Sequence, residues 1–195
     1  MTMATPMSLI RKLRSPNNRQ VLEAIEELRA RGWLEEGVLM GIPLLHVHFE
    51  GADLFNANLR GVDFHQAHLQ GCNLARADLT GAKLTRADLR GADFSKAVLK
   101  EADLYKADLR EARNLTDEQL AETKRLWGAT MPDGSVYDGR YNLNGDLQFA
   151  RWARVDVNDP EAMAYYLGVS LDAYLRGQEA AKRLKAQEMQ GHEAP

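Results

Sequence analysis

Apolar side chains recur every five residues through the middle of the chain. From residue 47 onward the sequence divides into thirteen consecutive units: VHFEG, ADLFN, ANLRG, VDFHQ, AHLQG, CNLAR, ADLTG, AKLTR, ADLRG, ADFSK, AVLKE, ADLYK and ADLRE. The middle residue of each unit is leucine or phenylalanine, and the residue two places before it is small, most often alanine. The middle residues are Phe49, Leu54, Leu59, Phe64, Leu69, Leu74, Leu79, Leu84, Leu89, Phe94, Leu99, Leu104 and Leu109.

A period of five fits neither the turn of a helix nor the two-residue alternation of a strand. It predicts a chain that turns a corner every five residues, with the middle residue and the small residue pointing inward. Four units would close one square coil, and the next coil would stack on it at about 4.8 Å, the spacing of neighbouring strands. Alanine then fills the narrow interior between layers of leucine and phenylalanine. The pattern predicts an all-β solenoid.

The units ADLFN, ANLRG, ADLTG, ADLRG and ADLYK, among others, match the pattern A(D/N)LXX without substitution. In these residues the chain resembles the pentapeptide-repeat family. The resemblance implies a right-handed quadrilateral β-helix, which we expect over residues 37–113, counting two weaker units around Leu39 and Leu44. The ends of such a coil stack need to be covered, so we expect an N-terminal helical cap and C-terminal helices.

Some members of this family resemble a DNA duplex and act on topoisomerases, a role that asks for a long and strongly acidic rod. Residues 47–113 contain ten acidic and ten basic side chains. Thirteen units make little more than three coils, or roughly 15 Å of length at the strand spacing. We therefore do not expect topoisomerase-directed DNA mimicry from this chain.

The sequence divides into four segments. Residues 1–36 are expected to form an N-terminal tail and an amphipathic capping helix. Residues 37–113 form the repeat region, residues 114–145 form a C-terminal cap, and residues 146–195 form a helical extension with a mobile end.

Capping residues mark the helices after the repeats. A capping box at Thr116 predicts a helix that runs to about Trp127. Asp159 is a typical N-cap in front of Pro160. Gly168 then predicts an interruption before the last helix of the chain.

Other features of the sequence argue against a disulfide, a membrane span and an enzymatic site. The single cysteine, Cys72, excludes an intramolecular disulfide, and its place at an inward small position predicts a buried, unreactive thiol. No apolar segment has the length of a signal sequence or a membrane span, so we expect a cytoplasmic protein that binds no membrane. No nucleophile stands beside a base and no phosphate-binding glycine loop is present. We expect neither enzymatic activity nor a cofactor.

Outward residues 20 apart should align in columns along the coil stack. One column reads His48, His68, Asp88 and Asp108. Two imidazoles and a carboxylate so aligned could hold a divalent cation, which makes His48 and His68 weak metal-ligand candidates. A solvated polar ladder is the preferred interpretation, because no further residue of the column completes a ligand set.

Basic residues occupy alternate corners of the predicted coil. Glycine stands at every tenth residue from Gly51 to Gly91, and the corners between carry mainly basic side chains. These corners and two further arginines form the predicted interaction surface, with two tyrosines of the C-terminal helices added. The alternative is that the charges only keep the protein soluble. The candidate residues are Arg76, Arg86, Arg90, Lys96, Lys106, Arg110, Tyr166 and Tyr174.

These patterns favour a protein-interaction or scaffolding module with a protein partner, and they allow a homodimer through the C-terminal helices. The alternative function is a structural dimer with a metal-binding or nucleic-acid-binding role. Residues 150–195 hold six basic and seven acidic side chains, and the net charge of the chain is −3. Binding to nucleic acid phosphates depends on an excess of basic residues, so we do not expect a nucleic-acid partner.

Overall fold

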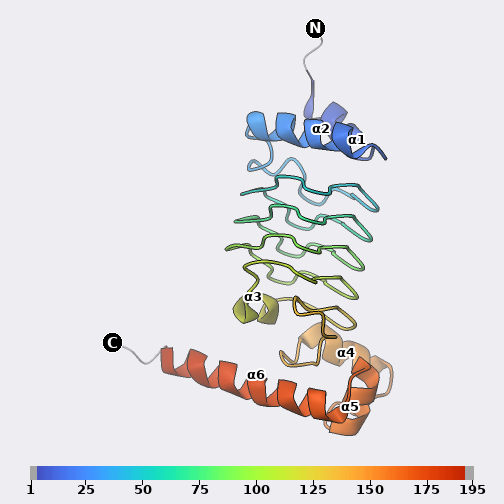
Figure 1. Ribbon diagram of the computed structural model, residues 1–195, viewed down its shortest axis with the longest axis vertical. Coiled ribbons are helices and arrows are strands. Elements are labelled where there is room, and N and C mark those ends of the chain that lie inside the picture. Colours follow the sequence, from blue (N-terminus) through green and yellow to red (C-terminus); the bar gives the residue numbers. More distant parts are fainter. Residues whose placement is uncertain (1–3, 192–195) are drawn as a thin grey trace.

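The computed structural model describes residues 4–191, with the side chains of residues 184, 185 and 187–191 left outside this description. Coils of the middle region stack between two helices at the N-terminal end and a helical group at the C-terminal end (Figure 1). The predicted mobile end of the chain falls on residues 192–195, outside the described residues. The helices are α1 (Pro6–Lys12), α2 (Asn18–Ala30), α3 (Asp117–Ala121), α4 (Asn144–Trp152), α5 (Pro160–Leu167) and α6 (Leu171–Gly191).

The coils pair through parallel bridges between residues 20 apart, which confirms the predicted twenty-residue period. The column that begins at His48 continues through His68, Asp88 and Asp108, and each residue bridges the next. The pairing takes the form of single-residue bridges, and no longer strand occurs within residues 4–191. The all-β part of the prediction is met only in part, because corners every five residues leave no room for extended strands, whereas the helices expected at both ends are present.

The interior of the stack is filled by the two inward positions of each unit. The thirteen middle residues are all at most 1% exposed, and the alanines two places before them are buried with them. Leu39 and Leu44 are also fully buried, so the weaker upstream units contribute to the same core. The rings of Phe49 and Phe64 meet edge to face, with centroids 5.7 Å apart.

Corners in the left-handed region of the backbone connect the faces, and they are not reserved for glycine. Asn56, Arg76 and Lys96 have φ of 56°, 58° and 57° at corners where no glycine stands. Where Asp or Asn precedes the middle residue it supports the turn, because its side-chain oxygen accepts a hydrogen bond from the backbone N–H two residues later. Asp78 accepts from Thr80 N at 2.9 Å in this way. This bond accounts for the Asp or Asn in the repeat pattern.

The coil stack continues beyond residue 113. Asp103 bridges Arg125 and Asp108 bridges Thr130, so the last coil repeats after 22 residues in place of 20. The short helix α3 lies in this coil and lengthens it by two residues. The helix predicted from Thr116 to about Trp127 is wrong in its length, because the chain returns to the stack directly after Ala121.

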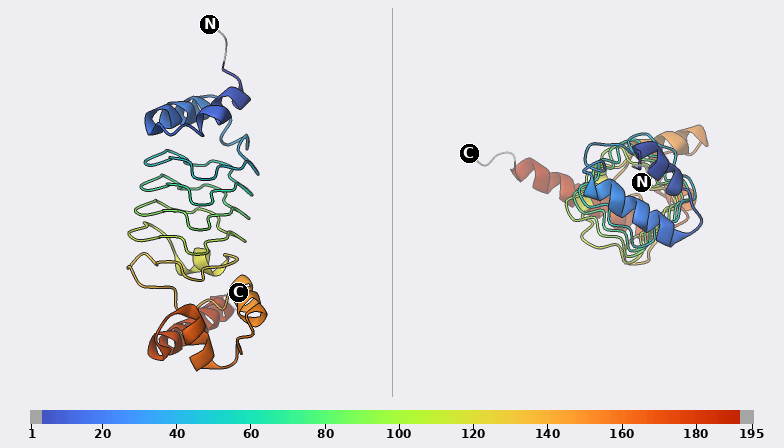
Figure 2. Two further views of the ribbon diagram at one scale, coloured as in Figure 1. Left: turned by 90° about the vertical axis from the view of Figure 1, so that its right-hand side faces the viewer. Right: turned by 90° about the horizontal axis from the view of Figure 1, so that it is seen from above.

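The N-terminal cap lies across the first coil (Figure 2). Val21, Ile25 and Leu28 of α2 are buried, and α1 packs beside α2 in the segment that the sequence predicted as a tail. The side-chain amide of Asn18 donates to the backbone oxygen of Glu50 at 3.1 Å and to its carboxylate at 2.7 Å. The first turn of α2 is thereby fixed to the first coil.

The C-terminal cap docks on the last coil through α4. The Asp146 carboxylate accepts from the backbone N–H groups of Leu126 and Trp127, at 3.1 and 3.0 Å. Gly145 makes this approach possible, because a Cβ at this position would lie 2.5 Å from the backbone oxygen of Lys124. The Trp127 indole N–H donates to the backbone oxygen of Tyr166 at 2.9 Å and connects α5 to the same coil.

Candidate functional site

The basic corners that the sequence singled out are exposed but do not form one surface. Arg76 and Lys96 belong to the column of corners that begins at Asn56, whereas Arg86 and Lys106 lie half a coil away. In a coil of four units, residues ten apart stand at diagonally opposite corners. The predicted double stripe is therefore divided between two sides of the stack.

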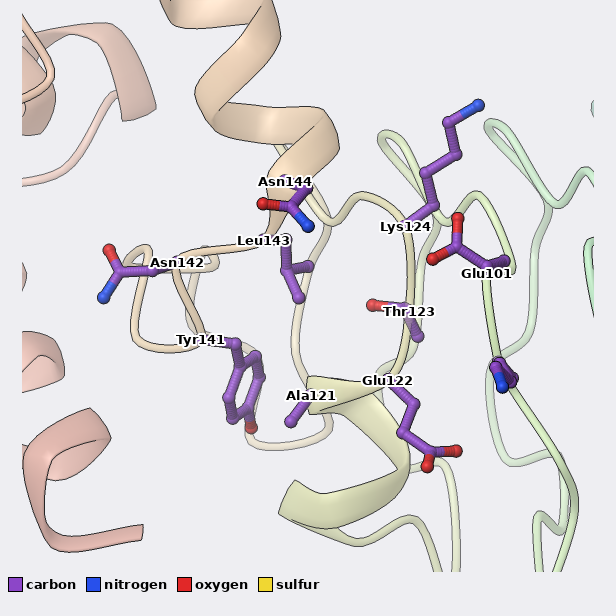
Figure 3. A pocket seen from close by; sticks show the side chains of 10 residues that line it. Glu101, Ala121, Glu122, Thr123, Lys124, Tyr141, Asn142, Leu143 and Asn144 are labelled. Carbon is purple, nitrogen blue, oxygen red and sulfur yellow. The ribbon is translucent and has the colours of Figure 1, made fainter. Parts of the chain in front are cut away.

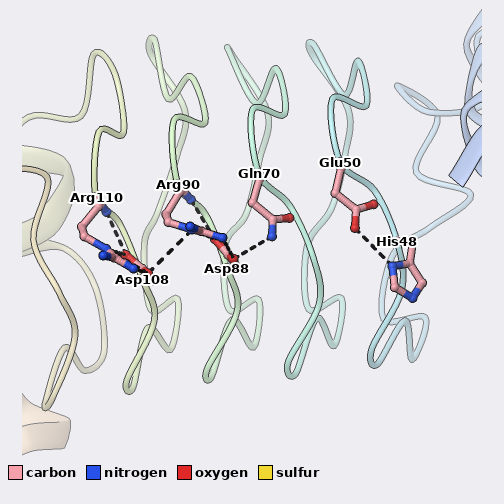
Figure 4. Close-up of polar contacts among 7 residues, drawn as sticks. All are labelled: His48, Glu50, Gln70, Asp88, Arg90, Asp108 and Arg110. Atoms are coloured by element: carbon pink, nitrogen blue, oxygen red, sulfur yellow. Dashed lines mark hydrogen bonds and ion pairs between the residues drawn. The ribbon is translucent and has the colours of Figure 1, made fainter.

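The other two predicted arginines lie together on one face of the stack (Figure 4). Arg90 donates to Asp88 at 2.8 and 2.6 Å, and Arg110 donates to Asp108 at 2.9 and 2.5 Å. Partial burial would raise the pKa of Asp88, but the bonds from Arg90 outweigh it and lower that pKa. The hydrogen bond from Arg110 likewise lowers the pKa of Asp108. These two arginines are already paired with carboxylates and offer little free charge to a partner.

The predicted surface tyrosines are both held in the cap. Tyr166 is half-buried, with its ring 5.6 Å from that of Trp127. Tyr174 is only 6% exposed, and its ring lies against Gly139. Tyr174 is thus a packing residue, because the pause at Gly168 turns this side of α6 toward the cap.

A cluster that the sequence did not indicate covers the side of the last coil. The rings of Tyr105 and Trp127 stack with centroids 5.2 Å apart. The Arg125 guanidinium lies between two rings, 4.6 Å from the centroid of Tyr105 and 5.0 Å from that of Phe149. Trp152 continues the row, with its ring 5.8 Å from Phe149. We name these five residues the C-terminal aromatic surface.

This surface combines a rigid base with an exposed edge. Arg125 is fixed by two hydrogen bonds to Asp103, at 3.1 and 2.5 Å, and its side chain is only 17% exposed. Phe149 is 44% exposed and Trp152 is 81% exposed. Lys106 adds a charge beside the rings, with its Nζ 4.9 Å from the centroid of Trp127. Trp152 is thus exposed to solvent, whereas the Arg125 side chain at the buried end of the same surface is held in place by Asp103.

A polar cleft of about 350 Å³ lies between α3 and residues 141–144 (Figure 3). Lysine and glutamate side chains line it, and no histidine, cysteine or aspartate is among its ten lining residues. The Thr123 hydroxyl donates its hydrogen bond to the Leu120 backbone oxygen at 2.7 Å, and not to a base that could activate it as a nucleophile. Burial raises the pKa of Tyr141, and the hydrogen bond that its hydroxyl donates to Asp117 raises this pKa further. The cleft offers charges but no nucleophile paired with a base.

The sequence-derived metal candidates lie on neighbouring coils. The rings of His48 and His68 stack with centroids 4.7 Å apart, and Glu50 lies beside them.

The remaining candidate for chemistry, Cys72, is fully buried, with its thiol donating to the Phe49 backbone oxygen. Burial raises the pKa of this thiol to about 12, so the group stays protonated and unreactive at neutral pH.

Only part of the C-terminal aromatic surface could have been found in the sequence. Residues 20 apart predict position 125 as the neighbour of Tyr105, whereas the two extra residues of the last coil bring Trp127 there. Phe149 and Trp152 lie three positions apart, a helical spacing that places them on one side of a helix. That spacing was the available signal for this half of the surface.

Stacked coils of twenty residues, a filled core and outward columns of polar side chains define a solenoid-type repeat protein. The family model Pentapeptide repeats matches residues 44–71 and 77–113 in eight copies. This region of the chain therefore belongs to the pentapeptide-repeat family.

No helix among the described residues is long and apolar enough to cross a membrane. No curated protein matches the chain significantly.

The solved structures that the chain matches include pentapeptide repeat proteins. HetL of the cyanobacterium Nostoc, involved in heterocyst differentiation regulation, is 42% identical with a TM-score of 0.45, over 49% of this chain and 43% of HetL. A protein of the Arabidopsis thaliana thylakoid lumen is 29% identical with a TM-score of 0.41, over 58% of this chain and 74% of that protein. Rfr23 of the cyanobacterium Cyanothece is 28% identical with a TM-score of 0.37, over 49% and 60%. The chain thus spans less than half the length of HetL.

Proposed function

We propose that this chain is a non-enzymatic module that binds a protein partner through the C-terminal aromatic surface. In this proposal the repeat region is the right-handed quadrilateral β-helix of its family and serves as a rigid support. One observation carries the proposal: Trp152 is 81% exposed at the end of a row of aromatic rings and one arginine.

The composition of this surface favours a protein as the partner. Tryptophan, tyrosine and arginine are the residues most enriched among those that dominate the binding energy of protein interfaces. The bonds from Arg125 to Asp103 hold the base of the surface in place before binding. A preorganised surface loses less conformational entropy on association. Exposed apolar side chains of the coil stack are smaller or less exposed than Trp152, since Phe55 is 37% exposed and Val98 is 42% exposed.

The charge distribution disfavours nucleic acid as the partner. Arg125 is already paired with Asp103, and the basic corners of the stack are divided between opposite sides. A phosphate backbone is bound by several unpaired cations on one surface. A second copy of this chain is a protein partner of the same chemistry, and exposed Leu171 and Leu175 of α6 would add apolar area to such a dimer.

The proposal is tested by exchanging the exposed aromatic rings. The full-length protein and the F149A/W152A variant are immobilised, proteins from the native lysate are captured, and the affinity of each purified partner is measured by calorimetry. A V98A/V136A variant is the matched control, because those side chains are also apolar and are 42% and 44% exposed. Light scattering on the free protein measures self-association.

We expect the F149A/W152A variant to lose affinity by about 30-fold or more, the effect of removing a dominant interface residue. The control should bind as the wild type does. Loss of self-association alone would identify the partner as a second copy. The proposal is wrong if the partner binds the F149A/W152A variant normally and is lost from an R76A/K96A variant, since that result places the site on a basic corner.

A further inference from the structure

His48, Glu50 and His68 bring three metal-binding side chains together near the N-terminal cap, far along the stack from the C-terminal aromatic surface. One ligand atom from each of the three lies within 4.8 Å of the other two. The two imidazole rings are nearly parallel, with 7° between their planes. Glu50 Oε1 lies 3.1 Å from His48 Nδ1 (Figure 4). The sequence column contained the two histidines but not Glu50, which lies two residues further along the same face.

Two oxygen atoms without partners border this cluster. The Gln70 side chain donates to Asp88 at 2.6 Å, and the Asn18 side chain donates to Glu50. Their carbonyl oxygens, Gln70 Oε1 and Asn18 Oδ1, are buried and accept no hydrogen bond from the described residues. A buried acceptor without a partner is unfavourable and uncommon in native proteins. A bound cation, or a water held by it, would satisfy such an oxygen.

We propose that His48, His68 and Glu50 bind one divalent transition-metal cation of the zinc type, with Gln70 beside them as an oxygen donor. Two imidazoles and one carboxylate are a ligand set that zinc takes in proteins, with a fourth position left for water or another oxygen. Calcium and magnesium prefer sites made of oxygen alone. The side chains of His48 and Glu50 are 38% and 34% exposed, so a cation can enter from solvent.

Binding requires a small movement of the side chains. Two ligands of one tetrahedral zinc lie about 3.3 Å apart, given zinc–nitrogen distances of about 2.05 Å. Parallel rings direct their lone pairs in parallel planes, so at least one imidazole has to rotate toward the other. The partial exposure of His48 and Glu50 leaves room for this rotation. Asn18 holds the second carboxylate oxygen of Glu50 and thereby orients the ligand.

The position of the site defines what the cation would do. His48 and His68 belong to consecutive coils, and Glu50 is bonded to the start of α2 through Asn18. A cation on these three residues would connect two coils and the N-terminal cap. Metal binding to the folded state alone raises its stability in proportion to the logarithm of the metal concentration. The cation would therefore act as a structural clasp at this end of the stack.

The test is a titration of tag-free, full-length protein with ZnCl₂, followed by calorimetry, with CoCl₂ as a spectroscopic probe of coordination geometry. The variants H48A, H68A and E50Q each remove one ligand. The matched control is H46A/H65A, which removes the neighbouring histidine pair, whose rings meet edge to face 6.0 Å apart outside the cluster. Circular dichroism in EDTA checks that each outward-facing variant is folded.

We expect one zinc ion per wild-type chain, tetrahedral cobalt absorption bands, and a higher melting temperature with zinc than with EDTA. Each ligand variant should weaken binding by about tenfold or more, and H46A/H65A should bind normally. The proposal is overturned if the wild type shows no saturable binding, or if H48A and H68A bind as tightly as the wild type. The F149A/W152A variant should keep its zinc, so failure here and failure of the proposed function are separate results.

Discussion

Trp127 stacks on Tyr105 with 11° between the ring planes, although the two residues are 22 positions apart in a stack that otherwise repeats every 20. The two additional residues come from the coil that contains α3. They set which side chains of the last coil lie against the previous one, and they bring Arg125 opposite Asp103. The C-terminal aromatic surface depends on this change of register.

Arg125 should contribute more to stability than an arginine of similar geometry on the open face. Its pairing with Asp103 is largely shielded, since the two side chains are 17% and 16% exposed. R125A would leave Asp103 without its partner and remove the contact between two rings. We expect the free energy of unfolding to fall by about 2–3 kcal/mol, measured by urea denaturation.

R110A is the matched control for this prediction. Arg110 also makes bidentate bonds to an aspartate, but its side chain is 51% exposed, and surface ion pairs contribute little. We expect a much smaller loss of stability than in R125A. Equal losses in the two variants would show that the ring contacts and the shielding of Arg125 have no energetic consequence.

Glycine corners and non-glycine corners should respond differently to alanine. Gly71 has φ of 65°, and a Cβ placed on it meets nothing within 4 Å, so G71A changes only the backbone preference. We expect it to lower the free energy of unfolding by about 1 kcal/mol. K96A at φ of 57° exchanges one non-glycine residue for another and should be nearly neutral. Thermal denaturation of both variants measures the difference, and equal effects would contradict the conformational explanation.

Asp146 should give the protein a stability term that grows as the solution is acidified. Burial raises the pKa of Asp146 to about 6, despite the two backbone hydrogen bonds that it accepts. The folded state therefore binds this proton more tightly than the unfolded state, whose aspartates titrate near 3.9. The contribution of Asp146 to the free energy of unfolding has its full value below the unfolded pKa. It is lost as the pH rises through 6, and its upper limit is about 3 kcal/mol.

The variant D146N isolates this contribution. We expect the wild type to gain stability relative to D146N as the pH is lowered from 7 to 4.5, measured by urea denaturation at each pH. Asp88 and Asp108, whose pKa values are lowered, act in the opposite direction and only at more acidic pH. A difference between wild type and D146N that does not change with pH would contradict the prediction.

The repeats made the middle of the fold predictable, because each inward position is fixed by the same local geometry. Leu39, Leu44 and all thirteen middle residues lie in one core that the sequence pattern identified. The twenty-residue period also places Arg76 and Arg86 half a coil apart. Their separation follows from the period, because residues ten apart in a coil of twenty stand at opposite corners.

The flanks were less predictable because no repeat constrains them. α1 has a capping box between Thr5 and Ser8, but its apolar face is too short to stand out in the sequence. The extent of α3 depends on tertiary pairing, since backbone groups of Lys124, Arg125, Trp127 and Thr130 bond to the previous coil and not within a helix. Capping chemistry alone located the starts of α3 and α5 correctly.

The helices that cover the two ends of the stack also cover the two edges at which another copy could continue the coil. A bare terminal coil presents the same hydrogen-bonding edge that each coil uses to receive the next one, and such an edge can accept a second molecule. Copies joined head to tail in this way would add without limit and grow into a filament. With α2 over one edge and α4 over the other, neither end of the stack presents a bare coil for such head-to-tail growth.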